Sequence, residues 1–422
     1  MEKVPGVACI LVHLPVKSLY ICSMPIDYQQ IYTRIKEIGA GAQERRKTLE
    51  ERRKKARGLL NAYASELDTL RAKVDSAKAV DANLRCALPI NESLASSYPP
   101  PASVKEATLI AADGSQINPD RHASVQFCLV NVGAIILKLN SGQSPEIDVT
   151  SELLYGDDLE TKSGLMTDGM VALRRDLKER TKLDELSKGI KGSVVAFTDG
   201  PIELWGASGD DAEAYREGIE QYKTVLSRLQ SRGVINAGYV DKPSADLVIR
   251  LLEIATAPQD QLQHLREYHP LRGVSDRWLF GDKENTLLLP GHRSAVFGIQ
   301  SGSEKNYKGT LSLHFFYLNV GTDGHPWPVR VEIPKWVADD AEKLNLLHAV
   351  LVEQCRMMGS RPYPYLLHRA HETAIVKQEE KQQIEQMLAQ ELRNQNEEVD
   401  QGSYKQSAKD LPARTSFGRR KS

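Results

Sequence analysis

The chain has 422 residues, of which 41% are hydrophobic and 26% charged, as in an ordinary folded domain. Its formal net charge of -1 gives no overall attraction to nucleic acid, although it does not exclude a local basic patch. The cysteines show no clustered spacing, which argues against a zinc knuckle or a disulfide framework and fits the reducing cytoplasm: they are Cys9, Cys22, Cys86, Cys128 and Cys355.

Residues 1–26 are weakly apolar but are interrupted by proline, histidine and lysine. This pattern, without a small-residue cleavage site, does not fit a secretion signal. No apolar run reaches the ~20 residues that a membrane-spanning helix needs, so we expect no membrane contact. We therefore expect a loose N-terminal extension, with Met24 as an alternative start to Met1. A protein that begins at Met24 should fold and keep its activity.

Residues 27–87 are rich in Glu, Lys, Arg, Ala and Leu and contain no proline, which predicts a long, coiled-coil-like helical region. Apolar residues recur there at helical spacing, at Leu59, Leu60, Tyr63, Leu67 and Leu70. Such a stripe can pair with another helix, so we expect this region to mediate dimerisation. The basic run "ERRKKAR" is interpreted as a solvated helix face, with DNA or dimer contact as the alternative.

Proline and serine cluster in residues 88–103, which predicts a linker to a domain over residues 104–395. In that domain buried strands alternate with helices, which predicts an α/β core with parallel strands. Strands are expected at 107–113, 124–137, 193–199, 234–243, 309–321 and 328–337, and helices at 170–189, 212–233, 340–359 and 363–395. Another helix should begin near Ser244, a suitable N-cap. The polar tail, 396–422, is expected to be disordered.

Two of the expected strands end in Asp-Gly, within "AADGSQI" (111–117) and "FTDGPI" (197–202). A turn is the usual reason for Asp-Gly. An aspartate at the carboxyl end of a strand, however, lies in the crevice where open α/β sheets bind ligands, and the glycine keeps that crevice clear. Asp113 and Asp199 together could hold one metal ion, and their hard oxygen ligands suit Mn²⁺ or Mg²⁺.

Further polar residues could complete such a site. Asp176 and Glu179 share a face of the helix before the second strand, although a solvated charged face is the commoner reason for this spacing. His371, on the last helix, could bind the metal or stabilise charge at a phosphate, or be structural. Lys242 follows a strand and Arg293 a Pro-Gly turn, so each is a candidate phosphate contact or a surface charge.

These stretches together resemble the NurA nuclease family, in which "ADGSQI", the helix with Glu179, "FTDGPI", "GYVDKP", "PGHRSAVF" and "YPYLLHRAHE" occur in the same order. The resemblance spans about residues 105–380. It implies an RNase H-like mixed sheet flanked by helices and a metal-dependent DNA nuclease that prefers manganese. It also implies a homodimer that works with a HerA-type hexameric ATPase in processing DNA ends.

The resemblance assigns roles by position. Asp113 and Asp199 match the two metal-binding aspartates of the family, and His371 matches its late histidine. Glu179 fits the family's helical glutamate best, with Asp176 and Glu185 as alternatives because one sequence does not set the helix register.

Two other functions are compatible with these residues: a non-catalytic adaptor that binds DNA ends or the ATPase, and a metal-dependent phosphatase acting on small molecules. Clustered carboxylates weigh against an adaptor, because a DNA-binding module has no need of negative charge. The basic helix and the absence of another phosphatase signature weigh mildly against the phosphatase.

Overall fold

The computed structural model describes residues 10–11, 20–21, 27–102, 104, 106–161, 164–205, 212–397 and 399. The chain forms two compact units, residues 1–55 and 56–422. Most of the expected extension and tail lies outside the described residues. Within the extension, β1 (Ile10–Leu11) pairs antiparallel with β2 (Tyr20–Ile21). No helix of the described residues is long and apolar enough to cross a bilayer.

The first unit contains α1 (Tyr28–Ala40) and the first part of α2 (Ala42–Ala62). Asp27 caps α1, because its side chain accepts hydrogen bonds from the backbone N–H groups of Gln29 and Gln30 at 3.0 and 3.1 Å. No residue of α1 is buried. One apolar stripe along this helix is therefore exposed to solvent, formed by Tyr28, Ile31, Tyr32, Ile35 and Ile38.

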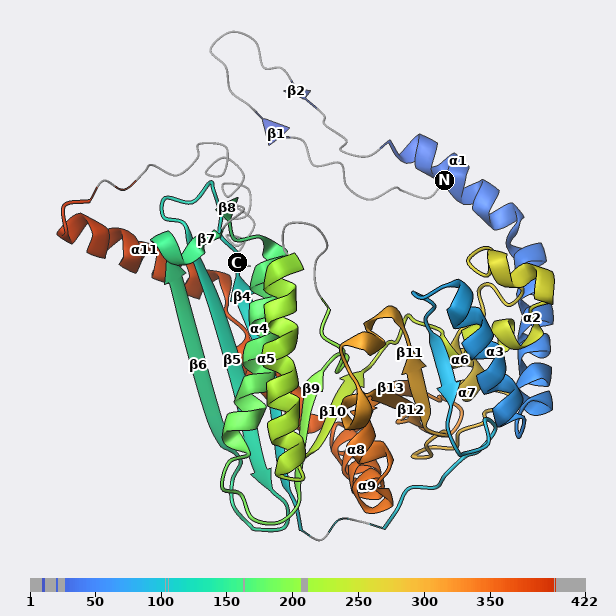
Figure 1. Ribbon diagram of the computed structural model, residues 1–422. Coiled ribbons are helices and arrows are strands. Elements are labelled where there is room, and N and C mark those ends of the chain that lie inside the picture. The colour runs from blue at the N-terminus through green and yellow to red at the C-terminus, as the bar shows by residue number, and fades with distance from the viewer. Residues whose placement is uncertain are drawn as a thin grey trace, which may run out of the picture. The chain divides into compact units, whose positions relative to one another are not determined.

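The second unit is built on a nine-stranded mixed sheet in the order β3-β11-β12-β13-β10-β9-β4-β5-β6 (Figure 1). Its strands are β3 (Cys86–Pro89), β4 (Thr108–Ile117), β5 (Phe127–Lys138), β6 (Glu146–Tyr155), β9 (Val194–Asp199), β10 (Ile235–Val240), β11 (Phe297–Gln300), β12 (Leu313–Asn319) and β13 (Pro328–Pro334). Strand β9 runs parallel to β4 and β10, and all other neighbours are antiparallel. A separate two-stranded ladder joins β7 (Glu160–Thr161) and β8 (Gly164–Leu165).

Five of the nine strands have the RNase H-like topology. In chain order β4, β5 and β6 form an antiparallel meander, and β9 and β10 then add to the other side of β4, parallel to it. The apolar runs of β4 and β9 are buried over residues 108–112 and 194–198, as expected for strands covered on both faces. The predicted fold class, an α/β protein with an RNase H-like mixed sheet, is therefore confirmed.

Helices cover both faces of this sheet: α3 (Leu67–Val80), α4 (Asp168–Leu186), α5 (Ala212–Ser231), α6 (Leu247–Thr256), α7 (Asp276–Gly281), α8 (Lys335–Ala338), α9 (Ala341–Met357), α10 (Tyr365–Ala374) and α11 (Gln378–Asn394). Figure 1 shows α4 and α5 side by side over the sheet. Helices α4 and α10 lie on opposite faces: a Cβ atom added to Gly114 would meet α4, and one added to Gly133 would meet α10. Asp113 pairs with Gly133, so Gly114 and Gly133 point to opposite faces.

The boundaries expected for the helical region and the linker differ from those of the structure. Leu60 and Leu70, in the predicted dimerisation stripe, are buried within the second unit, where α3 packs against α6 and β3. Part of the predicted linker is strand β3, which pairs with β11 in the sheet. Leu94, also in the predicted linker, is fully buried. These residues therefore belong to the second unit.

The predicted helix over 363–395 is two helices, α10 and α11, because the chain turns at residues 375–377. The carbonyl of Ala374, at the end of α10, accepts hydrogen bonds from Ser115 of β4 and Asn131 of β5. After the turn, Val376, Ile384 and Leu388 pack against the apolar cluster Ile117, Phe127 and Leu129. Polar contacts with the sheet thus end α10, and apolar contacts direct α11.

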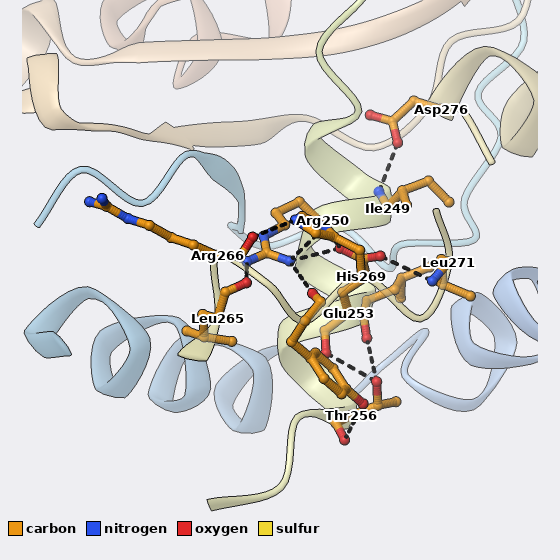
Figure 2. Close-up of polar contacts among 11 residues, drawn as sticks. Ile249, Arg250, Glu253, Thr256, Leu265, Arg266, His269, Leu271 and Asp276 are labelled. Atoms are coloured by element: carbon orange, nitrogen blue, oxygen red, sulfur yellow. Dashed lines mark hydrogen bonds and ion pairs between the residues drawn. The ribbon is translucent and has the colours of Figure 1, made fainter. Parts of the chain in front are cut away.

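Two buried carboxylates fix helix α6 (Figure 2). Asp276 accepts hydrogen bonds from the backbone N–H groups of Val248 and Ile249 at 2.9 and 2.7 Å, and burial raises its pKa to about 6. Glu253, 3% exposed, contacts Arg250 at 2.8 Å and His269 at 3.1 Å and accepts from the N–H of Leu271 at 3.0 Å. The expected cap at Ser244 is wrong, since the residue before α6 is Asp246 and Asp276 binds the free N–H groups.

His348 should make the protein less stable in acid. Its ring, on α9, is 1% exposed and its Nε2 lies 2.7 Å from the carbonyl oxygen of Gly291. Burial, together with the charges of Arg293 and His292, lowers its pKa from 6.5 to about 4. Between these two values the unfolded chain binds a proton that the folded chain does not, so the free energy of unfolding falls by ~3 kcal/mol as pH drops through this range.

Urea unfolding at pH 7, 5.5 and 4 measures this effect in the wild type and in His348→Gln. Glutamine retains an N–H donor for Gly291 but does not titrate. The wild type should lose ~3 kcal/mol more than the variant between pH 7 and pH 4. Equal losses would contradict the prediction.

Candidate active site

Asp113 lies within its strand and not at the end, so the strand end expected at this residue is wrong and no turn follows it. β4 continues through Gly114 to Ile117 and pairs with β5 over this whole length. Asp199 does end β9, and Gly200, with a φ of +88°, turns the chain away. The parallel pairing between β4 and β9 reaches Ala112 and Thr198. Both aspartates therefore lie where the two central strands separate.

Gly114 has a different role from the one expected. A Cβ atom there would lie 2.6 Å from Cγ of Arg175 and 2.7 Å from Oε1 of Glu179, both on α4. These distances are too short for any side chain, so only glycine lets α4 approach β4 this closely. The glycine thereby brings Glu179 beside the strand that carries Asp113.

A cavity of about 360 Å³ opens between the separating strands and α4. It is lined by Asp113, Gly114, Arg175, Asp176, Glu179, Arg180, Asp199, Gly200, Pro201, Glu203, Trp205 and His371. All four residues predicted as catalytic from the sequence, namely Asp113, Glu179, Asp199 and His371, thus face one space. They come from four elements that are far apart along the chain.

Asp113 and His371 form a close pair, with 2.6 Å between Oδ2 of the aspartate and Nδ1 of the histidine. The Asp113 side chain is 14% exposed and that of His371 is 57% exposed. Ser115, the serine of "ADGSQI", and Asn131 hold the end of α10 through the carbonyl of Ala374, three residues after His371. Nε2 of His371 has no hydrogen-bond partner among the described residues, so this atom can meet a substrate.

Glu179 is the buried acid of the cavity, with 4% of its surface exposed. Burial, together with the nearby carboxylates of Asp176 and Asp113, raises its pKa to about 8. Glu185, an alternative from the sequence, is 50% exposed on its side chain and lies 3.6 Å from Lys182. The structure therefore places Glu179 and Asp176 at the cavity, and Glu185 outside it.

Asp199 has a partner that sequence reasoning missed, Tyr363. Burial raises the pKa of Asp199, the charge of Asp113 raises it further, and a hydrogen bond from Tyr363 opposes this rise. The Tyr363 ring packs edge-on against Tyr239, with 5.4 Å between ring centroids, which positions its hydroxyl group. Tyr363 is the first tyrosine of "YPYLLHRAHE", a stretch that the sequence analysis had already singled out. No rule of sequence spacing, however, links this tyrosine to Asp199.

Two arginines of α4 were also missed. Arg175 contacts Asp176 at 2.8 Å, and its Nε lies 3.4 Å from Glu179. Arg180 is buried and donates hydrogen bonds to the carbonyl groups of Asp176 at 2.8 Å and Pro201 at 3.0 Å. Arg180 thus ties α4 to the chain after β9, while Arg175 offsets part of the negative charge of the cavity.

Neither Lys242 nor Arg293 lines this cavity. Arg293 is 5% exposed and binds both carboxylate oxygens of Glu92 at 3.0 Å, with its guanidinium 4.0 Å from the ring centroid of Tyr98. This ion pair explains the arginine of "PGHRSAVF" as a structural residue. Lys242 is exposed and lies 5.6 Å from the ring of Trp327.

Within the part of the chain that the structure describes, no group of three or more His, Cys, Asp or Glu side chains is arranged to hold a metal ion. The donor chemistry of the cavity nevertheless suits one. Its carboxylate oxygens are the ligands that Mn²⁺ and Mg²⁺ prefer. Mutual repulsion contributes to the raised pKa values of Glu179 and Asp199, and a divalent cation would relieve it.

The sequence matches the NurA domain family over residues 107–376. No curated protein matches it. Among solved structures, the NurA nuclease from Sulfolobus solfataricus is 14% identical over 79% of this chain and 94% of that chain, with a TM-score of 0.40. The catalytic domain of human endonuclease V is 13% identical over 76% and 98%, with a TM-score of 0.30.

Drosophila Piwi is 12% identical over 63% of this chain and 29% of its own, with a TM-score of 0.27. At these TM-scores the structural likenesses support no argument about function. The family match is different in kind, because it covers more than half of the chain and includes Asp113, Glu179, Asp199 and His371. The resemblance read from the sequence is thereby confirmed, and the chain belongs to the NurA family of nuclease domains.

Proposed function

We propose that this chain is a metal-dependent deoxyribonuclease that hydrolyses phosphodiester bonds in DNA. The observation that carries the proposal is the meeting of Asp113, Glu179, Asp199 and His371 in one cavity, at the point where the central strands of an RNase H-like sheet separate. Membership of the NurA family supports the same class of reaction.

Asp113, Asp199 and Glu179 would hold the Mn²⁺ or Mg²⁺ ion. A bound ion supplies Lewis-acid stabilisation of charge on the phosphate and lowers the pKa of a nearby water. Asp113 also orients His371 through its 2.6 Å contact with Nδ1, so that Nε2 can exchange a proton with the attacking or leaving oxygen. Tyr363 holds Asp199 in place, and Arg175 offsets the charge of Asp176 and Glu179.

The DNA backbone would bind a second cavity, of about 600 Å³, beside the end of β4. Basic side chains line it, namely Arg121, His122, Lys377 and Lys381, together with the acidic Asp120 and Asp168. It borders β4 beyond Asp113 and the α10–α11 connection beyond His371, so it adjoins the same elements as the active site. Contacts with phosphates carry little sequence information and weaken with salt, so we expect weak sequence preference and marked salt sensitivity.

The proposal is tested with labelled single- and double-stranded DNA in Mn²⁺, Mg²⁺ or EDTA. Hydrolysis with either metal and none in EDTA is the expected result. Binding of DNA without cleavage would support the adaptor, and cleavage of small phosphate esters without cleavage of DNA would support the phosphatase.

We also propose that the protein is a homodimer that associates through the exposed apolar stripe of α1, since the stripe expected at residues 59–70 is largely covered by the chain itself. Deleting residues 27–40 should give a monomer in light scattering. A truncated protein that stays dimeric would move the interface to residues 56–422.

A HerA-type hexameric ATPase remains the proposed partner in the processing of DNA ends. The proposal rests on the NurA family and on the absence of a GxxxxGK[ST] run from the sequence, which leaves the chain without a P-loop motor of its own. Co-precipitation at low salt and ATP-stimulated DNA degradation by the mixture are the expected results.

A further inference from the structure

Trp205 is an exposed aromatic residue at the rim of the candidate active site. It lines the same cavity as Asp113 and Asp199, and 56% of its surface is accessible. All four tryptophans lie in the described residues, and the other three, Trp278, Trp327 and Trp336, are buried or half-buried. An indole left open to solvent beside an acidic cavity needs a reason, because its burial elsewhere would stabilise the fold.

A chain of charged and polar side chains supports this indole. The guanidinium carbon of Arg85 lies 4.8 Å from the ring centroid of Trp205. Arg85 is in turn held by Glu203 at 2.7 Å, and Glu203, 3% exposed, accepts a hydrogen bond from Ser303. The cation therefore occupies a set position against the ring, as in a cation–π pair.

The backbone before Trp205 is equally constrained. The N–H of Ile202 donates to Glu332 at 3.1 Å, and the N–H of Leu204 donates to the hydroxyl of Tyr307 at 2.9 Å. The carbonyl of Leu204 accepts from the hydroxyl of Tyr215 at 3.1 Å. Hydrogen bonds thus hold the residues immediately before Trp205 in place, which reduces the conformational entropy lost when a ligand contacts the indole.

We propose that Trp205 stacks on an unpaired nucleobase of the DNA strand whose phosphate enters the carboxylate cavity. This inference rests on the proposed deoxyribonuclease function and adds a positioning residue to it. A base in a duplex is already stacked on both sides, so the contact selects single-stranded DNA or a strand end that has been unpaired. An aromatic platform tolerates all four bases, because each base has a π-face.

The test measures binding of labelled single-stranded oligonucleotides in EDTA, where the strand stays intact. One oligonucleotide carries every base, and a series carries a single abasic site at successive positions. The proteins compared are the wild type, Trp205→Ala, Trp205→Phe and the control Trp278→Ala. Trp278 stacks on Arg57 with 5.1 Å to the ring centroid but does not line the cavity. Circular dichroism checks that each variant is folded.

The wild type should bind about tenfold more weakly when one particular base is missing, the size of effect that loss of one base–aromatic stack produces. Trp205→Ala should bind the complete strand about tenfold more weakly and lose this sensitivity to the abasic site. Trp205→Phe and Trp278→Ala should behave as the wild type. A merely structural role for Trp205 would weaken binding of all these oligonucleotides equally and leave the sensitivity unchanged.

The experiment distinguishes failure of the stacking role from failure of the proposed nuclease function. If the wild type cleaves DNA and Trp205→Ala keeps the same sensitivity to the abasic site, the stacking role is wrong while the nuclease function stands. If the wild type neither binds nor cleaves DNA with Mn²⁺ or Mg²⁺, the proposed function fails and the stacking role fails with it.

Discussion

Asp113→Asn and Asp199→Asn should each reduce DNA hydrolysis by at least ~10³-fold, which corresponds to a loss of ~4 kcal/mol of transition-state stabilisation. Asparagine keeps the shape of aspartate but removes one negative charge from the cavity that would bind the divalent ion. Asp113→Asn also removes the carboxylate that orients His371 through Nδ1. Affinity for Mn²⁺, measured by isothermal titration calorimetry, should fall in both variants, which gives a readout besides activity.

The same substitutions should leave the melting temperature of the metal-free protein unchanged or slightly higher. Burial and the charge of Asp113 raise the pKa of Asp199, so the ionised pair is unfavourable without a cation. A neutral side chain at either position removes that repulsion. A large drop in melting temperature would instead show that the loss of activity follows from misfolding.

Two glutamate variants on α4 provide the matched control. Glu179→Gln should lose activity like the aspartate variants, because Glu179 lines the cavity. Glu185→Gln should be as active as the wild type, because Glu185 lies on the exposed side of the same helix. Wild-type cleavage by both aspartate variants at saturating metal would exclude the proposed catalytic role of this cavity.

Gly133→Ala should impair both stability and activity although it lies outside the cavity. A Cβ atom at Gly133 would be 2.7 Å from the backbone nitrogen of Ala374 and 2.9 Å from the carbonyl carbon of Thr373. Backbone atoms cannot swing aside as a flexible side chain can, so α10 must shift as a whole. Such overpacking costs ~1–3 kcal/mol of folding free energy.

The shift should move His371, which lies on the same helix, away from Asp113. A displacement of ~1 Å in a catalytic group can reduce the rate about 100-fold. Chemical denaturation and the nuclease assay measure the two effects. Gly298→Ala is the control in another strand of the sheet, since its Cβ would make ordinary contacts of 3.4 Å with Ile90 and Leu88. If Gly133→Ala retains wild-type stability and activity, α10 is not packed as tightly as the structure indicates.

The sequence was sufficient to predict the central strands and most helices, because their positions follow from the local pattern of apolar residues. The apolar runs before Asp113 and Asp199 predict β4 and β9, and the pattern before Gly233 predicts α5, whose chain turns at this glycine with a φ of +71°. Asp113 and Asp199 could be named in the same way, since strand ends in α/β sheets gather polar side chains. Glu179 and His371 lie on helices, and the resemblance to the NurA family assigned them.

Contacts between segments that are distant in the sequence determined the features that the sequence did not predict. The end of α10 depends on Ser115 and Asn131, which lie more than 240 residues earlier in the chain, so the helix pattern of residues 363–395 alone could not locate the break. Arg293 looked suited to a phosphate until the structure paired it with Glu92. The identity of a charged residue does not show whether its partner is a ligand or another side chain. Only the folded structure shows which partner it has.

The sequence by itself therefore determined the type of core and the carboxylates at its centre, because strand burial and strand ends are local properties of the chain. Tertiary structure alone decided that Asp113 lies within a continuous strand and that Gly114 is needed for the approach of Glu179. It also decided that Arg175 and Trp205 line the same cavity and that Tyr363 bonds to Asp199. These features depend on contacts between side chains of separate elements. Such contacts produce no periodic pattern in the sequence, so the sequence alone does not predict them.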